Sequence, residues 1–205
     1  KRLMAYKKKK DPAVPIYDDE FLQLLEELNK KRERKAAERY IYLIQLMNVY
    51  GIRAHEGPHL YVQTINNKKA VFCDSNKTTE LGESPDNREL YGLHPHWEKE
   101  FDLINKIENN YPLPPKGDQG LGDALGKYLA KVDYWKHLRK TRNLVPYSMR
   151  HGFAYRMHQD ARYRNKISSR EGAALMGHDH SIHLDTYGKW TPQGSMRSNL
   201  DEKLG

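Results

Sequence analysis

The fold is decided by a stretch that follows Pro146 and reads YSMRHGFAYRMHQ over residues 147–159. We expect a helix here, from Tyr147 to about Asp160, with the proline just before its start. Tyr147 and Arg150 are three positions apart, so they share one helix face and can point into one pocket. Arginine suits a phosphate ligand, because its planar fork binds two oxygens at once and stays charged at physiological pH. This helix face is therefore the candidate active site.

The chain carries an excess of positive charge. Its 205 residues suit one large domain, and they include 35 Lys and Arg against 27 Asp and Glu. The formal net charge is +8 and the isoelectric point is ≈ 9.3, which is typical of proteins that bind polyanions. Charge alone names no partner, so a nucleic-acid ligand and a merely basic protein both remain open.

Cysteine usage and hydropathy limit the class of protein further. Cys73 is the single cysteine, which excludes an internal disulfide framework and a multi-cysteine zinc site. No apolar run approaches the roughly 20 residues needed to cross a bilayer, and no apolar signal core follows the N-terminal lysines. We therefore expect a soluble protein of a reducing, prokaryotic cytoplasm.

Two helices are expected near the start of the chain. Asp18 can cap the first, whose apolar residues fall at helical spacing: Phe21, Leu24, Leu25 and Leu28. The second should begin near Glu33 and end at Gly51, which is placed to adopt a left-handed conformation. Its inward residues would be Tyr40, Leu43, Ile44, Met47 and Tyr50. Both helices should belong to the core.

Three short strands should follow. Residues 60–65 and 70–73 have strand-like composition and flank a turn at Asn66-Asn67. Residues 88–93 are a candidate third strand, reached through a polar loop at residues 74–87. The sequence therefore predicts a small sheet.

The rest of the chain is expected to be helical, at residues 97–108 and 120–137 and again in the last third. The residues Ser168-Ser169-Arg170-Glu171 form a capping box that opens a short helix, and Gly177 can close it. His178 then lies just beyond a helix end. A further short helix from Ser181 would carry Tyr187 near its end.

Three motifs, taken together, resemble those of a known enzyme family. The segment GIRAHE at residues 51–56 is similar to the pattern that carries the first catalytic arginine of tyrosine recombinases, also called phage-type integrases. Residues 147–154, YSMRHGFA, resemble the family's second motif, an arginine followed by histidine and then an aromatic-alanine pair. The third is LMGH at residues 175–178, and Tyr187 follows His178 at the family's spacing. The resemblance covers roughly residues 14–187.

The resemblance implies DNA cleavage without any metal or cofactor. Arg53 and Arg150 would hold the scissile phosphate. His178 would donate a hydrogen bond to the phosphate or assist protonation, and Tyr187 would attack in line. A 3′-phosphotyrosine intermediate keeps the bond energy, so rejoining to a 5′-hydroxyl would need no ATP.

The family also uses a lysine, in the turn between the second and third strands of its small sheet. The segment Ser75-Asn76-Lys77-Thr78 directly follows the second expected strand, so the resemblance implies that Lys77 protonates the leaving 5′-oxygen. Lys68 and Lys69, in the first turn, are alternatives.

The chain departs from the family at Tyr147, where most members have histidine. A phenol with a pKa near 10 can donate a hydrogen bond to phosphate at neutral pH, but it is a poorer proton acceptor than imidazole. Base catalysis from this position is therefore doubtful. In having a tyrosine at this position, the chain resembles the recombinases that excise DNA elements from cyanobacterial genomes.

The resemblance implies a mainly α fold with a small antiparallel β-sheet, the DNA breaking-rejoining architecture of tyrosine recombinases. Residues 1–15 would be a basic arm or linker, residues 16–187 the catalytic domain, and residues 188–205 a C-terminal tail that docks on a neighbouring protomer. The expected partners are duplex DNA, three further copies in a tetramer on paired sites, and an accessory directionality factor. Because the chain starts at Lys1, we also expect that an N-terminal DNA-clamping domain is missing.

Each candidate residue has a purely structural alternative. Arg53 could cap the preceding helix, Tyr147 and Phe153 could be core aromatics, and Tyr187 could sit at a rim. A non-catalytic DNA-binding module would then explain the charge. The histidines and carboxylate of residues 178–183 also suggest a metal-dependent nuclease, although no familiar metal motif accompanies them.

Overall fold

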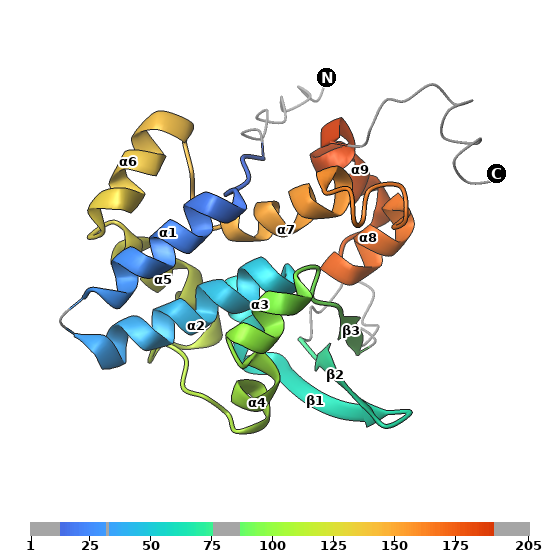
Figure 1. Cartoon of the computed structure of the whole chain (residues 1–205), viewed down its shortest axis with the longest axis horizontal. Helices are drawn as coiled ribbons and strands as arrows, with labels where there is room; N and C mark the ends of the chain where they lie inside the picture. The colour runs from blue at the N-terminus through green and yellow to red at the C-terminus, as the bar shows by residue number, and fades with distance from the viewer. Residues whose placement is uncertain (1–12, 32, 76–86, 191–205) are drawn as a thin grey trace, which may run out of the picture.

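The computed structural model describes residues 13–31, 33–75 and 87–190. Within them, α-helices surround a central helix, and a small three-stranded sheet lies at one edge of the molecule (Figure 1). The helices are α1 (Asp18–Asn29), α2 (Arg34–Tyr50), α3 (Pro95–Glu100), α4 (Leu103–Glu108), α5 (Leu121–Leu129), α6 (Asp133–Arg142), α7 (Ser148–Gln159), α8 (Ser169–Met176) and α9 (His180–Tyr187). Three short 3-10 helices are η1 (Ala54–His59), η2 (Asp118–Gly120) and η3 (Gly188–Trp190).

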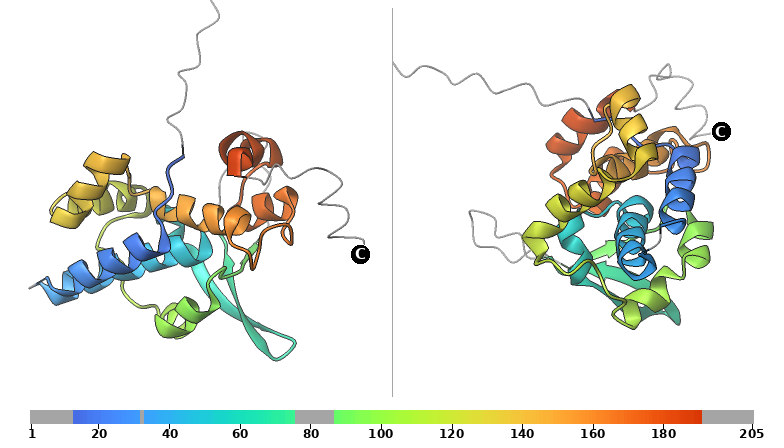
Figure 2. Two further views of the ribbon diagram at one scale, coloured as in Figure 1. Left: turned by 45° about the horizontal axis from the view of Figure 1, so that its top comes forward. Right: turned by 90° about the vertical axis from the view of Figure 1, so that its left-hand side faces the viewer.

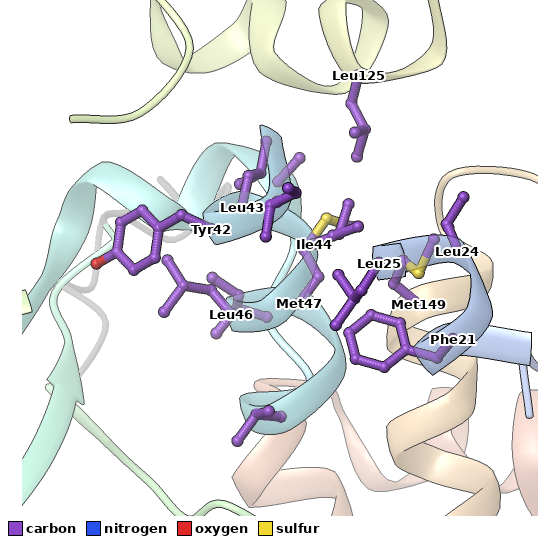
Figure 3. Packing of buried hydrophobic residues seen from close by; sticks show 14 of the residues in the cluster. Phe21, Leu24, Leu25, Tyr42, Leu43, Ile44, Leu46, Met47, Leu125 and Met149 are labelled. Carbon is purple, nitrogen blue, oxygen red and sulfur yellow. The ribbon is translucent and has the colours of Figure 1, made fainter. Parts of the chain in front are cut away.

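The centre of the molecule is α2. Every residue from Ile41 to Tyr50 is buried, so this part of the helix is covered on all sides rather than along one stripe. Figure 3 shows its side chains packed against α1, α5 and α7, with these residues labelled: Phe21, Leu24, Leu25, Leu43, Ile44, Met47, Leu125 and Met149. The two core helices expected from the sequence are confirmed, with the predicted apolar residues of α1 buried.

A buried arginine ties these central helices together. Arg156, on α7, donates hydrogen bonds to the Asp18 carboxylate at 2.7 Å and to both oxygens of Asn48 on α2. The predicted capping residue Asp18 is therefore used as an ion-pair partner instead. The helix cap is one residue earlier, at Tyr17, whose backbone N–H donates to Glu20 at 2.9 Å.

The sheet is antiparallel, with the order β1 (Leu60–Ile65), β2 (Lys68–Cys73) and β3 (Arg88–Leu90). Asn66 and Asn67 both have positive φ, 49° and 60°, as a type I′ hairpin turn requires. This confirms the predicted hairpin, while β3 is shorter than the expected strand. The register pairs Arg88 with Cys73, which places the arginine at the end of the sheet away from the hairpin turn.

Two helices that were expected to be continuous are each divided into two in the structure. The helix predicted at residues 97–108 is α3 and α4, separated at Asp102, whose φ of 54° is left-handed. Aspartate is one of the few residues that adopt this conformation readily. The helix predicted at residues 120–137 is α5 and α6, separated at Val132, which is extended and buries its side chain. After these breaks, α4 lies against β1 and α6 lies against α1 (Figure 2).

The last third matches the prediction closely. Helix α7 spans Ser148–Gln159, and α8 opens with the predicted capping box, in which Glu171 N–H donates to the Ser168 hydroxyl. Gly177 ends α8 in the left-handed conformation, with φ 58°. Within the described ranges, no helix is both long and apolar enough to cross a bilayer.

The described part of the C-terminal tail packs on the domain. Trp190 in η3 lies against Tyr155 and Tyr187, with ring centroids 5.5 Å and 5.4 Å away. Lys189 donates a hydrogen bond to the Ala13 carbonyl at 2.8 Å. Residues 1–12 of the expected arm at 1–15 and residues 191–205 of the expected tail at 188–205 lie outside the described residues.

Gly51 forms the turn after α2 that positions the candidate site. Its φ is 65°, and a Cβ there would lie 2.4 Å from the Phe153 ring on α7. Glycine is therefore needed at this position both for the left-handed backbone conformation and for the close approach of the Phe153 ring. The turn brings the residues that follow it to the N-terminal end of α7.

We predict that Gly51→Ala lowers the free energy of unfolding by about 2 kcal/mol or more, because the left-handed conformation costs about 1–2 kcal/mol and the Phe153 ring must move. Urea denaturation measures this change. Gly122→Ala, on α5, is the matched control, since its Cβ meets nothing within 4 Å. That variant should be neutral or up to about 1 kcal/mol more stable. Equal effects of the two substitutions would contradict the prediction.

Candidate active site

Arg150 lies at the centre of the site and is 0% exposed. It projects from the first turn of α7. One Nη donates to the Gly51 carbonyl, and the other lies 2.5 Å from both the Met176 carbonyl and His178 Nε2. The end of α2 and the end of α8, far apart in the sequence, are therefore joined through this one guanidinium.

Arg53 approaches from the other side. It follows the Gly51 turn and caps η1, where its backbone N–H and its guanidinium each lie 2.7 Å from an oxygen of Glu56. The guanidinium also donates to the Gly177 carbonyl at 3.2 Å. Arg53 and Arg150 thus converge on the same turn, at Gly177-His178.

Glu56 is a buried carboxylate, 3% exposed, with three arginines around it. Its oxygens lie 2.7 Å from Arg53, 3.1 Å from Arg88 and 3.7 Å from Arg150. Burial alone would raise the pKa of Glu56, but the charges of Arg88, Arg150 and Arg53 lower it to about 2. The carboxylate is therefore ionised, and the cluster keeps an excess of two positive charges.

The sequence did not indicate the position of Arg88. It starts β3, and its guanidinium lies under the Gly177 turn, where a Cβ would be 1.7 Å from its Nη1. The only sequence signal was a polar residue at the start of a strand, because the motif patterns do not include this arginine. Glu56 was part of a motif but had no role assigned to it.

His178 is neutral in this arrangement. Burial and then the charges of Arg150 and Arg53 lower its pKa to about 2, so its Nε2 accepts the hydrogen bond from Arg150. Its ring is stacked on that of Tyr187, with centroids 5.9 Å apart. A phosphate anion bound beside it would favour the protonated ring, since opposite charges raise the pKa of an imidazole.

Tyr187 ends α9 and is 0% exposed, rather than at a rim. Its hydroxyl lies 3.1 Å from His151 Nδ1. Burial raises the pKa of Tyr187, although the charge of Arg150 and a hydrogen bond from it act in the opposite direction. The phenol is therefore protonated in this state and lies beside the guanidinium of Arg150.

Tyr147 caps α7 and lies over the same guanidinium. Its ring centroid is 5.7 Å from the Arg150 Cζ, as expected for two residues on one helix face. Burial acts to lower the pKa of Arg53, but Glu56 and the Tyr147 hydroxyl together hold it above its ordinary value. Tyr147 therefore interacts with both arginines.

The structure brings together five of the six residues singled out in the sequence: Arg53, Tyr147, Arg150, His178 and Tyr187. Lys77 lies outside the described residues. The alternatives Lys68 and Lys69 start β2 beside the hairpin turn, at the end of the strand opposite to Cys73 and Arg88. Lys69 pairs there with Glu108 at 2.6 Å.

The histidines near Tyr187 do not converge on one point. His180 bonds to the Ser169 hydroxyl at 2.8 Å, whereas His183 Nε2 lies 3.1 Å from His158 Nε2. In the part of the chain that the structure describes, no group of three histidine, cysteine or acidic side chains is arranged to hold a metal ion. The geometry thus gives no support to a metal centre at residues 178–183.

We predict that Glu56→Gln destabilises the protein by about 3–5 kcal/mol, because the buried Arg150 and the partly buried Arg53 and Arg88 lose their counter-charge. The depressed pKa of Glu56 means that its stabilising effect is present above pH 4.5 and is lost as the pH falls towards 2. The difference in unfolding free energy between the two proteins, measured by urea denaturation, should therefore shrink as the pH falls from 4.5 towards 2.

The control is Glu89, an exposed residue that follows Arg88 in β3. Its replacement by glutamine should change stability by no more than about 0.5 kcal/mol. A pH-independent difference would contradict the assignment.

No family model matches the sequence, and no curated protein matches it. Solved structures do resemble it. The XerH site-specific recombinase, in a post-cleavage complex with a palindromic difH substrate, has a TM-score of 0.56 at 17% identity, over 95% of this chain and 53% of that one. The Tn1549 transposon integrase, in complex with circular intermediate DNA, has a TM-score of 0.52 at 13% identity, over 96% and 67%.

The chain spans about half the length of XerH. The likeness extends over nearly all of this chain. At 13–17% sequence identity this likeness shows the fold alone. The chain therefore has the fold of tyrosine recombinase catalytic domains.

Proposed function

We propose that the chain is the catalytic domain of a site-specific recombinase that cleaves and rejoins duplex DNA through a 3′-phosphotyrosine at Tyr187. The observation that carries this proposal is the convergence of two guanidinium groups, Arg53 and Arg150, and one phenol from three distant segments. The fold and the order of the motifs agree with it.

The charge of the cluster suits this chemistry. The three arginines around Glu56 leave an excess of two positive charges, and the phosphorane formed during attack carries one negative charge more than the phosphodiester. Fixed charges at the place where charge develops lower the barrier without reorganisation. Arg53 and Arg150 would bind the two non-bridging oxygens, and Tyr187 would attack the phosphorus in line.

The leaving 5′-oxygen needs an acid. We propose Lys77 for this role, because in the sequence it lies four positions after Cys73, the residue of β2 that pairs with Arg88. His178 is placed to donate a hydrogen bond to the phosphate once the anion favours its protonated form.

In this structure the candidate site is largely closed to solvent. Arg150 and Tyr187 are both 0% exposed, while the Arg53 side chain is 14% exposed. A phosphodiester would therefore meet Arg53 first and reach Arg150 by replacing its hydrogen bonds to Met176 and His178. Binding of DNA should accordingly shift the turn between α8 and α9.

The partners are part of the same proposal. A single cleavage domain breaks one strand, so recombination of two duplexes requires four copies on paired sites. The basic chain, with a net charge of +8, supports duplex DNA as the ligand. The tail beyond residue 190 is proposed to contact a neighbouring protomer, and an accessory protein would set the direction of the reaction.

We predict that the protein forms a covalent adduct with nicked suicide DNA carrying its recombination site, and that Tyr187→Phe forms none, because phenylalanine lacks the nucleophilic oxygen. Denaturing gel electrophoresis detects the adduct. Tyr155→Phe is the matched control, a tyrosine of α7 that packs on Trp190 and should not be needed for adduct formation.

A chelator should leave the yield of adduct unchanged. DNA binding without any adduct would indicate a non-catalytic module, and inactivation by chelator would indicate a nuclease.

We predict that Arg53→Lys lowers the cleavage rate by about 10²–10³-fold, since lysine keeps the charge but loses the fork that binds two oxygens. Binding of the same DNA, measured by fluorescence anisotropy, should change little. Arg170→Lys, at an exposed position of α8, serves as the control and should cleave normally. Equal rates for Arg53→Lys and the control would exclude a direct phosphate contact.

A further inference from the structure

The hydroxyl of Tyr187 already has a hydrogen-bond partner, and it is a residue to which the proposed reaction gives no role. His151 follows Arg150 on α7 and is 8% exposed. Its Nδ1 lies 3.1 Å from the Tyr187 hydroxyl, and the two rings meet edge to face at 68° with centroids 5.7 Å apart. The nucleophilic atom is thus held against an imidazole in a buried space.

The protonation states fix the direction of this hydrogen bond. Burial and then the charges of Arg150 and Lys189 lower the pKa of His151 to about 4, so the ring is neutral at physiological pH. The phenol is protonated, because burial raises the pKa of Tyr187. The hydroxyl therefore donates and Nδ1 accepts, which places the ring proton on Nε2.

The other candidate bases are occupied or unsuitable. His178 Nε2 accepts from Arg150, and His183 Nε2 faces His158. Tyr147, at the position where related enzymes have histidine, is a phenol and a poor proton acceptor at neutral pH. Among the described side chains, His151 is the imidazole that hydrogen-bonds the nucleophile, and it lies one helical turn after Tyr147.

We propose that His151 is the general base that activates Tyr187, in place of the histidine that the chain lacks at position 147. This inference rests on the proposed function. In cleavage, the Tyr187 oxygen forms a bond to phosphorus as its proton passes to His151 Nδ1, and the bond from phosphorus to the 5′-oxygen breaks as that oxygen takes a proton from the acid. In rejoining, the 5′-hydroxyl attacks phosphorus and returns its proton to the acid, while the bond from phosphorus to the Tyr187 oxygen breaks and the imidazolium returns its proton to that oxygen.

The surroundings of His151 favour this transfer once DNA is bound. The charged groups that face the ring are Arg150 on its own helix and Lys189 in η3, and the rings of Tyr147 and Tyr187 lie against it. A bound phosphodiester brings one negative charge, which offsets part of this positive charge and stabilises an imidazolium next to the phosphorane. The base therefore becomes stronger at the step that needs it.

The test is the rate of single-turnover cleavage of nicked suicide DNA by His151→Asn. Asparagine can place its amide oxygen near the position of Nδ1, so it keeps an acceptor for the phenol but cannot take the proton. At about pH 7 the rate should fall by about 10²–10⁴-fold with little change in DNA binding. The gap should narrow between about pH 7 and about pH 9.5, because hydroxide increasingly takes the proton that asparagine cannot accept.

Two controls separate base catalysis from packing. His158→Asn replaces another buried histidine of α7, and any loss that it shows should be constant across the same pH range. DNA with a sulfur in place of the bridging 5′-oxygen needs no acid, because the thiolate leaves unaided. This substrate should restore the rate of Lys77→Ala but not that of His151→Asn. His151→Gln provides a second variant if asparagine prevents folding, as judged by circular dichroism.

The outcomes distinguish this inference from the proposed function. If the unaltered protein forms no adduct, the proposed function itself is wrong. If it forms the adduct, and the His151 variants cleave within about 3-fold of its rate, or with a gap that does not vary with pH, His151 is not the base. Recovery of the His151→Asn rate on the sulfur-bridged DNA would assign the histidine to leaving-group protonation instead.

Discussion

The site depends on one buried interaction, the contact of the Glu56 carboxylate with three guanidinium groups. Without the carboxylate, Arg53, Arg88 and Arg150 would repel one another in a space of low dielectric. With it, η1, β3 and α7 are held at a common point. The same arginines reach the turn at Gly177, so the segment that carries the nucleophile is attached to this point as well.

The helical body serves to place that charge cluster. Because α2 is covered on all sides from Ile41 to Tyr50, its C-terminal end has a fixed position, and the Gly51 turn directs the chain from there towards α7. Arg156 fixes α7 against α1 and α2 in a similar way, through Asp18 and Asn48. Two buried arginines of one helix thus have different tasks, one in the scaffold and one in the site.

Local sequence signals predicted most of this fold. The Asn66-Asn67 turn, the Ser168 capping box and the left-handed glycines at 51 and 177 each follow from the conformational preferences of a few neighbouring residues. Features set by distant contacts were missed. The break at Asp102 and the place of Arg88 depend on packing and on strand register across a long loop, which neighbouring residues do not encode. The hydrogen bond between His151 and Tyr187 likewise joins residues of two helices whose approach no motif specifies.

The full burial of Arg150 also bears on how tightly a substrate can be bound. An exposed arginine side chain samples many rotamers and loses about 2 kcal/mol of conformational entropy when it is immobilised. Arg150 is immobilised already by full burial and by the Gly51 carbonyl, which a ligand does not have to displace, so this loss occurs when the chain folds. Its interaction with an incoming ligand is then not reduced by side-chain ordering, which is the thermodynamic meaning of preorganisation.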